Sequence, residues 1–273
     1  MSSGGFRTTH YQITQNFINM TDLQNSTTPA ITYSEYYQQC FCSDNLELMK
    51  SIESNTIDLI YCDILYGTGR KFKDYQDLKP IRSEIENHYI PRIKEMHRIL
   101  KQTGSIYLQM DWRINHWIRC IMDDIFGYEQ FRNEIKWIYG AGDVNTKNRF
   151  CRVSDHILFY AKTELNKFNI QKDEKDAKVK DWWRIFSFGE KTFNKKWFAE
   201  NEGEFIYATQ KPKSLIERII KASSNEGDLV ADFYAGSFTT AEVCKDLNRN
   251  FIGCDINPKA VEIGLKRLNG GVS

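Results

Sequence analysis

Short apolar runs rich in β-branched and aromatic residues recur along the chain, and polar or helix-like stretches separate them. Runs of this length and composition predict strands buried in a sheet. They are TIDLIYC (56–62), GSIYLQM (104–110), NEIKWIY (133–139), HILFYA (156–161), GDLVADF (227–233) and NFIGCD (250–255).

Between these runs, apolar residues return at spacings of three and four, which predicts amphipathic helices. The clearest helix runs from 113 to 126 and ends at Gly127, a residue suited to a C-terminal cap. Pro212 opens a second helix, and Asn257 with Pro258 begins a third. Strands that alternate with helices predict an α/β fold with a doubly wound, mostly parallel sheet.

Two segments depart from this alternation. Residues 1–35 are rich in Ser, Thr, Asn and Gln and lack the apolar core of a signal peptide, so we expect a polar arm. Residues 162–205 mix lysines with Trp and Phe without a clear period, which predicts a small inserted lobe. Residues 36–161 and 206–273 would then be the two halves of one domain.

Composition bears on the cellular location of the protein and on its possible metal, membrane and polyanion partners. The 37 Lys and Arg balance 36 Asp and Glu, so any contact with a polyanion must come from local patches. Seven cysteines without a CxxC pair predict reduced thiols in a cytoplasmic protein, and five scattered histidines predict no metal site. No apolar run approaches the roughly 18 residues of a membrane span, so no membrane partner is expected.

Two of the predicted strands have an aspartate at or next to their last residue, and each aspartate precedes a glycine-containing loop. Ligands of open α/β sheets bind beyond the carboxyl ends of the strands, so Asp63 and Asp232 should border one crevice. The turn after Asp232 offers hydroxyls and backbone amides, and Gly236 allows a close approach of the backbone. Asp255 ends the next strand, where dinucleotide-type folds keep the acid that binds ribose, which predicts a ribose-bearing cofactor.

Three motifs carry a resemblance to a known family. DFYAGSFTT (232–240) resembles the cofactor loop DPFxGSGTT of S-adenosylmethionine-dependent DNA amino-methyltransferases, and DILY (63–66) resembles their catalytic tetrapeptide DPPY. YATQKPKSLIERIIKASSNEGDLV (207–230) resembles their TQKP segment. The order, with the tetrapeptide first, is similar to the β class, whose target-recognition region lies between the two motifs and here would be the 162–205 lobe.

The resemblance implies a class I methyltransferase (Rossmann-like) fold, S-adenosyl-L-methionine as cofactor and double-stranded DNA as substrate. Asp63 and the carbonyl of Ile64 would accept hydrogen bonds from an exocyclic amine, and Tyr66 would stack on the flipped base. The residues implied for the cofactor are Asp232, Phe233, Ala235, Gly236, Ser237, Thr239, Thr240, Asp255, Thr209 and Lys211.

Some positions depart from the family pattern. Ile64 and Leu65 replace the prolines of DPPY, which removes rigidity but keeps the backbone carbonyl. Phe233 replaces the proline of the cofactor loop, and Phe238 replaces its second glycine. The Phe238 side chain would either crowd the cofactor or point into the neighbouring core.

Basic residues in the loop after DILY, in the loop 140–152 and in the 162–205 lobe are the candidates for DNA contacts, although a solvated charged surface is the alternative. They are Arg70, Lys147, Arg149, Arg184, Lys195 and Lys196. Within the family, Asp in the tetrapeptide favours N6 of adenine over N4 of cytosine. We therefore expect a sequence-specific adenine methyltransferase, with a cognate restriction endonuclease and a homodimer as further partners. The alternatives are an N4-cytosine enzyme and a DNA-binding relic that has lost turnover.

Overall fold

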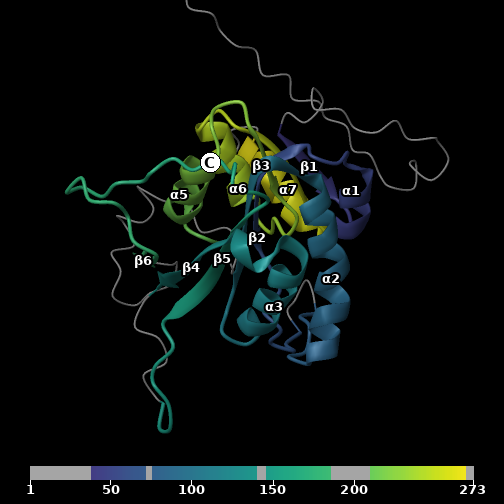
Figure 1. Cartoon of the computed structure of the whole chain (residues 1–273). Helices are drawn as coiled ribbons and strands as arrows, with labels where there is room; N and C mark the ends of the chain where they lie inside the picture. The colour runs from purple at the N-terminus through teal and green to yellow at the C-terminus, as the bar shows by residue number, and fades with distance from the viewer. Residues whose placement is uncertain (1–37, 72–75, 140–145, 186–209, 269–273) are drawn as a thin grey trace, which may run out of the picture.

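An eight-stranded sheet forms the centre of the computed structural model, which describes residues 38–71, 76–139, 146–185 and 210–268 (Figure 1). The strands are β1 (Gln39–Cys42), β2 (Ile57–Asp63), β3 (Leu100–Met110), β4 (Phe131–Ile138), β5 (Ser154–Ala161), β6 (Trp182–Arg184), β7 (Leu229–Asp232) and β8 (Asn250–Asp255). Their order is β1-β8-β7-β2-β3-β5-β4-β6. Only β5 runs antiparallel to its neighbours, so the prediction of a mostly parallel sheet is confirmed.

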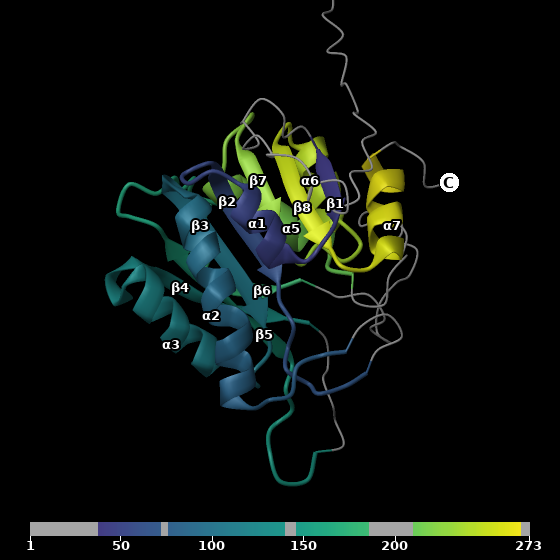
Figure 2. The ribbon, with the colours of Figure 1, turned by 90° about the vertical axis from the view of Figure 1, so that its right-hand side faces the viewer.

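Helices cover both faces of the sheet, as Figure 2 shows. On one face lie α1 (Asn45–Ser51), α2 (Arg82–Ile99) and α3 (Asn115–Phe126), followed by the short 3-10 helix η3 (Tyr128–Gln130). On the other face lie α5 (Lys213–Ser223), α6 (Thr239–Asp246) and α7 (Pro258–Leu268). Each face buries its own apolar cluster, so the chain has the three layers of a doubly wound fold.

The six predicted strands all form, whereas β1, β6, α1 and α2 were not predicted. β1 and β6 are too short to show a periodicity. The long helix α2 contains Pro91, a residue that usually ends a helix, yet its face with Ile85, Tyr89 and Ile93 is fully buried. Packing of that apolar face outweighs the hydrogen bond that Pro91 cannot donate.

The described part of the predicted lobe, residues 162–185, contacts the main domain. Lys167 Nζ lies 2.9 Å from Asp58 Oδ1 and 2.7 Å from Asp228 Oδ1, and β6 pairs in parallel with β4. Trp183 is buried in the α5-side cluster, whereas Trp182 is 54 % exposed. Residues 186–209, like the predicted arm at 1–35, lie outside the described residues, so the lobe boundaries stay predictions.

The topology brings the carboxyl ends of β2 and β7 together. These strands lie side by side in the sheet; the next strand beyond β2 is β3, and the next strand beyond β7 is β8. Such a switch point opens a crevice at the carboxyl edge of the sheet. Because β5 is antiparallel, its first residues also reach this edge, where His156 pairs with Met110.

Candidate functional site

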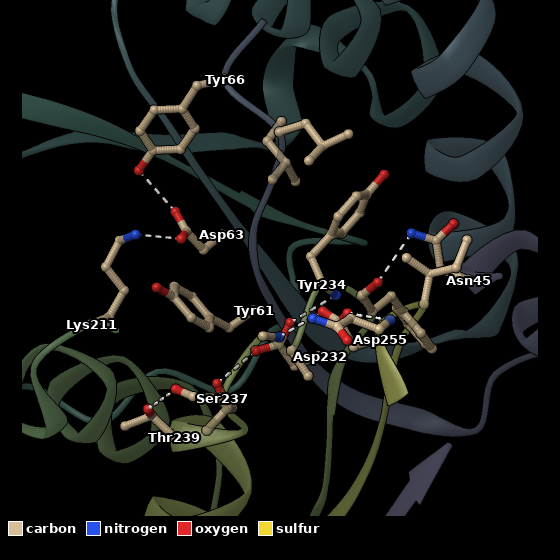
Figure 3. A pocket seen from close by; sticks show the side chains of 18 of the residues that line it. Asn45, Tyr61, Asp63, Tyr66, Lys211, Asp232, Tyr234, Ser237, Thr239 and Asp255 are labelled. Carbon is tan, nitrogen blue, oxygen red and sulfur yellow. Dashed lines mark hydrogen bonds and ion pairs between the residues drawn. The ribbon is translucent and has the colours of Figure 1, made fainter. Parts of the chain in front are cut away.

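A cavity of about 640 Å³ opens at this switch point. It brings together the predicted catalytic residues Asp63, Ile64 and Tyr66. From the predicted cofactor set it contains Lys211, Asp232, Phe233, Ala235, Gly236, Ser237, Thr239, Thr240 and Asp255. Figure 3 shows Asp63 and Tyr66 on one wall of the cavity and the turn after β7, with Asp232 and Ser237, on another. Thr209 lies outside the described residues.

Asp232 ties the end of β7 to the start of α6. Its side chain is buried, and its two oxygens accept hydrogen bonds from Thr240 Oγ1 (2.6 Å) and the Tyr234 amide (3.1 Å). Burial raises the pKa of the Asp232 carboxyl to about 7, although both of these hydrogen bonds lower it. The carboxylate therefore holds the turn between β7 and α6, the predicted cofactor loop, in shape.

Asp255 joins the two loops that face the cavity from β7 and β8. Its oxygens accept hydrogen bonds from the Gly236 amide (2.9 Å) and the Asn257 amide (2.8 Å), which leaves lone pairs for a ligand. Gly236 has a φ of 51°, and a side-chain carbon there would meet no atom within 4 Å. The turn therefore borders open space, as a loop that receives a ligand must.

Asn257 carries a buried donor at the same wall. Its Nδ2 has no hydrogen-bond partner within the described part of the chain, and the residue lines the cavity. An unpaired buried donor costs about 1–3 kcal/mol, which a bound ligand would recover. The carboxylate of Asp255 and the amide of Asn257 together suit the hydroxyls and ring nitrogens of a nucleoside, so these residues fit S-adenosylmethionine.

Phe238 points away from the cavity. It adopts a left-handed conformation (φ 57°, ψ 33°), and its ring is fully buried with its centroid 6.2 Å from that of Phe251. A side-chain carbon added at Gly264 of α7 would lie 2.5 Å from Phe238 Cγ. The Phe238 side chain therefore points into the neighbouring core, the second of the two predicted positions, and does not crowd the cavity.

On the wall of the cavity formed by the DILY segment, Asp63 accepts hydrogen bonds on both oxygens. The Tyr66 hydroxyl lies 2.8 Å from Oδ1, and Lys211 Nζ forms an ion pair with Oδ2 (Figure 3). Lys211 Nζ also lies 5.6 Å from the centre of the Tyr66 ring. Lys211, which the resemblance assigned to the cofactor, thus contacts the predicted catalytic carboxylate.

Tertiary hydrogen bonds hold the DILY segment, which lacks the two prolines of its family pattern. The Ile64 amide donates to Gln109 O (3.0 Å), and the Tyr89 hydroxyl donates to Leu65 O (2.9 Å). Just beyond the segment, Asp77 accepts from the amides of Gly67 and Thr68. These contacts supply the rigidity that proline would otherwise provide.

A further polar group, from the start of α1 and from α2, was not predicted from the sequence. Arg92 donates to Asn45 Oδ1 (2.6 Å) and Asp44 Oδ2 (2.9 Å), and Asn45 Nδ2 donates to Phe233 O (3.0 Å). All three polar residues line the cavity. An aspartate followed three positions later by Glu47 is a helix-start signal that could have located Asp44.

A second missed group lies behind Tyr66. Asp155, only 4 % exposed, accepts hydrogen bonds from the Tyr66 hydroxyl (2.7 Å) and Gln109 Nε2 (3.2 Å). Burial raises the pKa of the Asp155 carboxyl to about 6. The alternation of β5 places Asp155 on the same face as buried Ile157 and Phe159, a signal visible in the sequence.

The predicted DNA contacts are not part of the cavity lining. Arg70 follows the DILY loop, Lys147 and Arg149 lie on the β4–β5 connection, and Arg184 is in the edge strand β6; all four are exposed. Lys195 and Lys196 lie outside the described residues.

Among the residues that the structure describes, no group of three or more His, Cys, Asp or Glu side chains is arranged to hold a metal ion. The helices within these residues include none with the length and apolar character needed to cross a membrane.

The sequence matches known proteins over most of its length. A family model described as DNA methylase matches residues 57–266. The type II methyltransferase M.HpaI of Haemophilus parainfluenzae is 32 % identical over 238 residues, which cover 85 % of this chain and 74 % of that protein. The DNA adenine methyltransferase YhdJ of Escherichia coli K12 is 30 % identical over 245 residues, covering 83 % and 81 %.

Solved structures share the fold at lower identity. The cytosine-N4-specific PvuII DNA methyltransferase aligns with a TM-score of 0.68 at 22 % identity, over 84 % of this chain and 85 % of that one. The M1.HpyAVI–SAM complex aligns with a TM-score of 0.57 at 20 % identity, over 84 % and 98 %.

Proposed function

The chain belongs to the N6/N4 DNA methylase family, and from this premise we propose that it methylates the exocyclic N6 of an adenine flipped out of double-stranded DNA. As a member of that family it is a DNA methyltransferase, and its cofactor is S-adenosyl-L-methionine, as predicted from the sequence. The target base, the recognised sequence and the roles of individual residues are our proposals.

The observation that supports adenine most directly is the carboxylate of Asp63 in the cavity, beside the Tyr66 ring. The lone pair of an exocyclic amine is delocalised into its ring, so acceptors for the amine hydrogens favour the attacking form. Asp63 and the carbonyl of Ile64 would be those acceptors, and Tyr66 would hold the base by stacking. The relative YhdJ is named as a DNA adenine methyltransferase, which agrees with this choice.

The β7–β8 wall would hold the cofactor. Asp255 would accept the ribose hydroxyls, the unpaired Nδ2 of Asn257 would donate to the nucleoside, and the Gly236 turn would lie against it. When bound, S-adenosylmethionine supplies an electrophilic methyl group. The residues of the chain position the amine, exclude water from it and receive its proton.

We further propose a partner enzyme, a cellular location and a recognition segment. The names of M.HpaI and other relatives describe type II methyltransferases, which supports a role in restriction-modification with a cognate endonuclease. Because these relatives are bacterial enzymes of DNA, we propose the cytoplasm as the location. The 162–205 segment would recognise the target sequence, with Lys195, Lys196 and Arg184 as contacts. A homodimer stays a prediction.

One experiment tests the reaction and the base together. The protein is incubated with radiolabelled S-adenosylmethionine and mixed-sequence DNA, the DNA is digested, and the labelled nucleoside is identified. N6-methyladenine is the expected product, and Asp63→Ala, which removes the acceptor for the amine hydrogens, should abolish it while still binding the cofactor. N4-methylcytosine would overturn the choice of base. Cofactor binding without any labelled nucleoside would favour the DNA-binding relic.

A further inference from the structure

The hydroxyl of Tyr66 lies between two carboxylates. Its oxygen is 2.8 Å from Asp63 Oδ1 and 2.7 Å from Asp155 Oδ2. A phenol has a single hydrogen and can donate it to only one of them at a time. Asp63, Tyr66 and Asp155 therefore form a continuous chain of oxygens along which a proton can pass.

Gln109 holds the far end of this chain in place. Its Nε2 lies 3.2 Å from Asp155 Oδ2 and 3.3 Å from the Tyr66 oxygen. The Tyr61 hydroxyl donates to Gln109 Oε1 at 2.9 Å, which directs the amide hydrogens of Gln109 toward Asp155. Burial raises the pKa of Tyr61 far above neutrality, so Tyr61 stays a donor.

The surroundings of Asp155 set its charge. Its side chain is buried, and burial raises its pKa to about 6; Lys211 and the Tyr66 hydrogen bond lower the pKa, and the charge of Asp63 raises it. Asp155 is thus ionised at neutral pH but can accept a proton readily. The groups that face it are Tyr66, Asp63, Lys211, Gln109 and Tyr139.

We propose that Asp155 is the final acceptor of the proton that the exocyclic amine releases. Asp155 does not touch the amine itself; it receives the proton through the hydroxyl of Tyr66. This inference rests on the proposed function. In methyl transfer a bond forms between the amine nitrogen and the methyl carbon, the carbon–sulfur bond breaks with its electron pair left on sulfur, and the nitrogen loses one proton.

The chain of oxygens accounts for that proton. Asp63 Oδ1 takes it from the nitrogen and passes it to the Tyr66 oxygen, while Tyr66 gives its own hydrogen to Asp155 Oδ2. Asp63 and Tyr66 return to their starting states, and Asp155 becomes neutral until the proton reaches solvent after the product leaves. The relay also removes the positive charge of the methylated nitrogen, which the nearby Lys211 ammonium would otherwise repel.

The first test measures single-turnover methyl transfer from about pH 5 to about pH 8. The wild-type rate should fall as the pH drops through about 6, because protonated Asp155 cannot accept a proton. Asp155→Asn should lower the neutral rate roughly 100-fold or more and remove this pH step. Affinities for the cofactor and for DNA should stay within a few-fold. Asp111→Asn, an equally small change at another buried carboxylate, should keep the pH step.

The second test uses the protein alone and needs no turnover. In a titration followed by NMR of the aspartate carboxyl carbons, the resonance missing from Asp155→Asn should have a midpoint near pH 6. Tyr66→Phe should raise this midpoint, because the hydrogen bond of the hydroxyl lowers the Asp155 pKa. If Asp155→Asn does not fold, Tyr66→Phe serves as the test variant in both experiments and should also lose the pH step.

The outcomes separate this inference from the proposed function. An active wild type together with an Asp155→Asn variant that keeps the rate or the pH step would overturn the relay alone. A folded wild type that methylates no DNA would overturn the relay and the proposed function together. An N4-methylcytosine product would change the base and leave the relay in place, since that amine also releases a proton.

Discussion

The ring of Phe238 occupies the space that a side chain at position 264 would fill. A carbon added to Gly264 would lie 2.5 Å from Phe238 Cγ, so the bulky residue in the cofactor loop requires a glycine in α7. This pairing explains how the chain can hold a phenylalanine at a left-handed position beside the cofactor site without closing that site.

We expect Gly264→Ala to lower the free energy of unfolding by roughly 1–3 kcal/mol, because the new methyl group overpacks the core against Phe238. Chemical denaturation of both single variants and of the Gly264→Ala/Phe238→Ala double variant would measure the coupling. In the Phe238→Ala background the cost of Gly264→Ala should largely disappear. Equal costs in the two backgrounds would contradict the pairing.

Asp255→Ala should weaken S-adenosylmethionine binding by roughly 1.5–3 kcal/mol, the contribution of a hydrogen bond to a charged group. Isothermal titration calorimetry measures this directly. Glu226→Ala is the matched control, because this exposed carboxylate precedes β7 at the opposite edge of the sheet and should leave the affinity unchanged. Unaltered affinity in Asp255→Ala would exclude Asp255 from the cofactor site.

The ring and the hydroxyl of Tyr66 should have separable effects. Tyr66→Ala should lose roughly 1–3 kcal/mol of binding to DNA with an unpaired target base, because the stacking surface is removed. Tyr66→Phe keeps the ring and should bind this DNA like the wild type, yet transfer the methyl group more slowly. Fluorescence of 2-aminopurine at the target position, measured beside single-turnover rates, distinguishes the two effects. Equally weak binding by both variants would argue against stacking.

The buried Asp58 should be a major contributor to stability. It accepts hydrogen bonds from Lys101 (2.7 Å), Lys167 (2.9 Å) and the Leu229 amide (3.0 Å), and it links the 162–185 segment to β2 and β7. Asp58→Ala should cost about 3 kcal/mol of unfolding free energy in urea denaturation, since the buried Leu229 amide loses its acceptor and each lysine loses one of its contacts; Lys167 keeps its ion pair with Asp228. Loss of less than about 1 kcal/mol would mean that water replaces these contacts.

Asp232 should make stability depend on pH. Its pKa in the folded protein, about 7, is above that of an unfolded aspartate, so the folded state binds this proton more tightly. The stability that the protonated carboxyl contributes is therefore fully present at low pH and is lost as the pH rises toward 7. Relative to wild type, Asp232→Asn should therefore gain about 1.4 kcal/mol for every pH unit between the two pKa values. Denaturation curves at acid and neutral pH measure the difference. A constant difference would show that Asp232 titrates normally.

The sequence by itself determined the main strands, the mostly parallel sheet and the residues at the carboxyl ends of β2, β7 and β8. These features follow from local rules, since apolar runs predict strands and the topology of an α/β sheet brings their ends to one edge. The sequence therefore predicts Asp63, Asp232, Asp255 and the turn at Gly236 at this edge, and all of them line the cavity.

Only the tertiary structure decided the contacts between distant segments. Asp155 reaches Tyr66 because β5 is antiparallel, and Lys211 pairs with Asp63 across 148 positions of sequence. The direction of the Phe238 ring likewise depends on Gly264, a residue in a different helix. Local patterns report the period and burial of an element, whereas these contacts depend on the order, direction and packing of elements that no local pattern encodes.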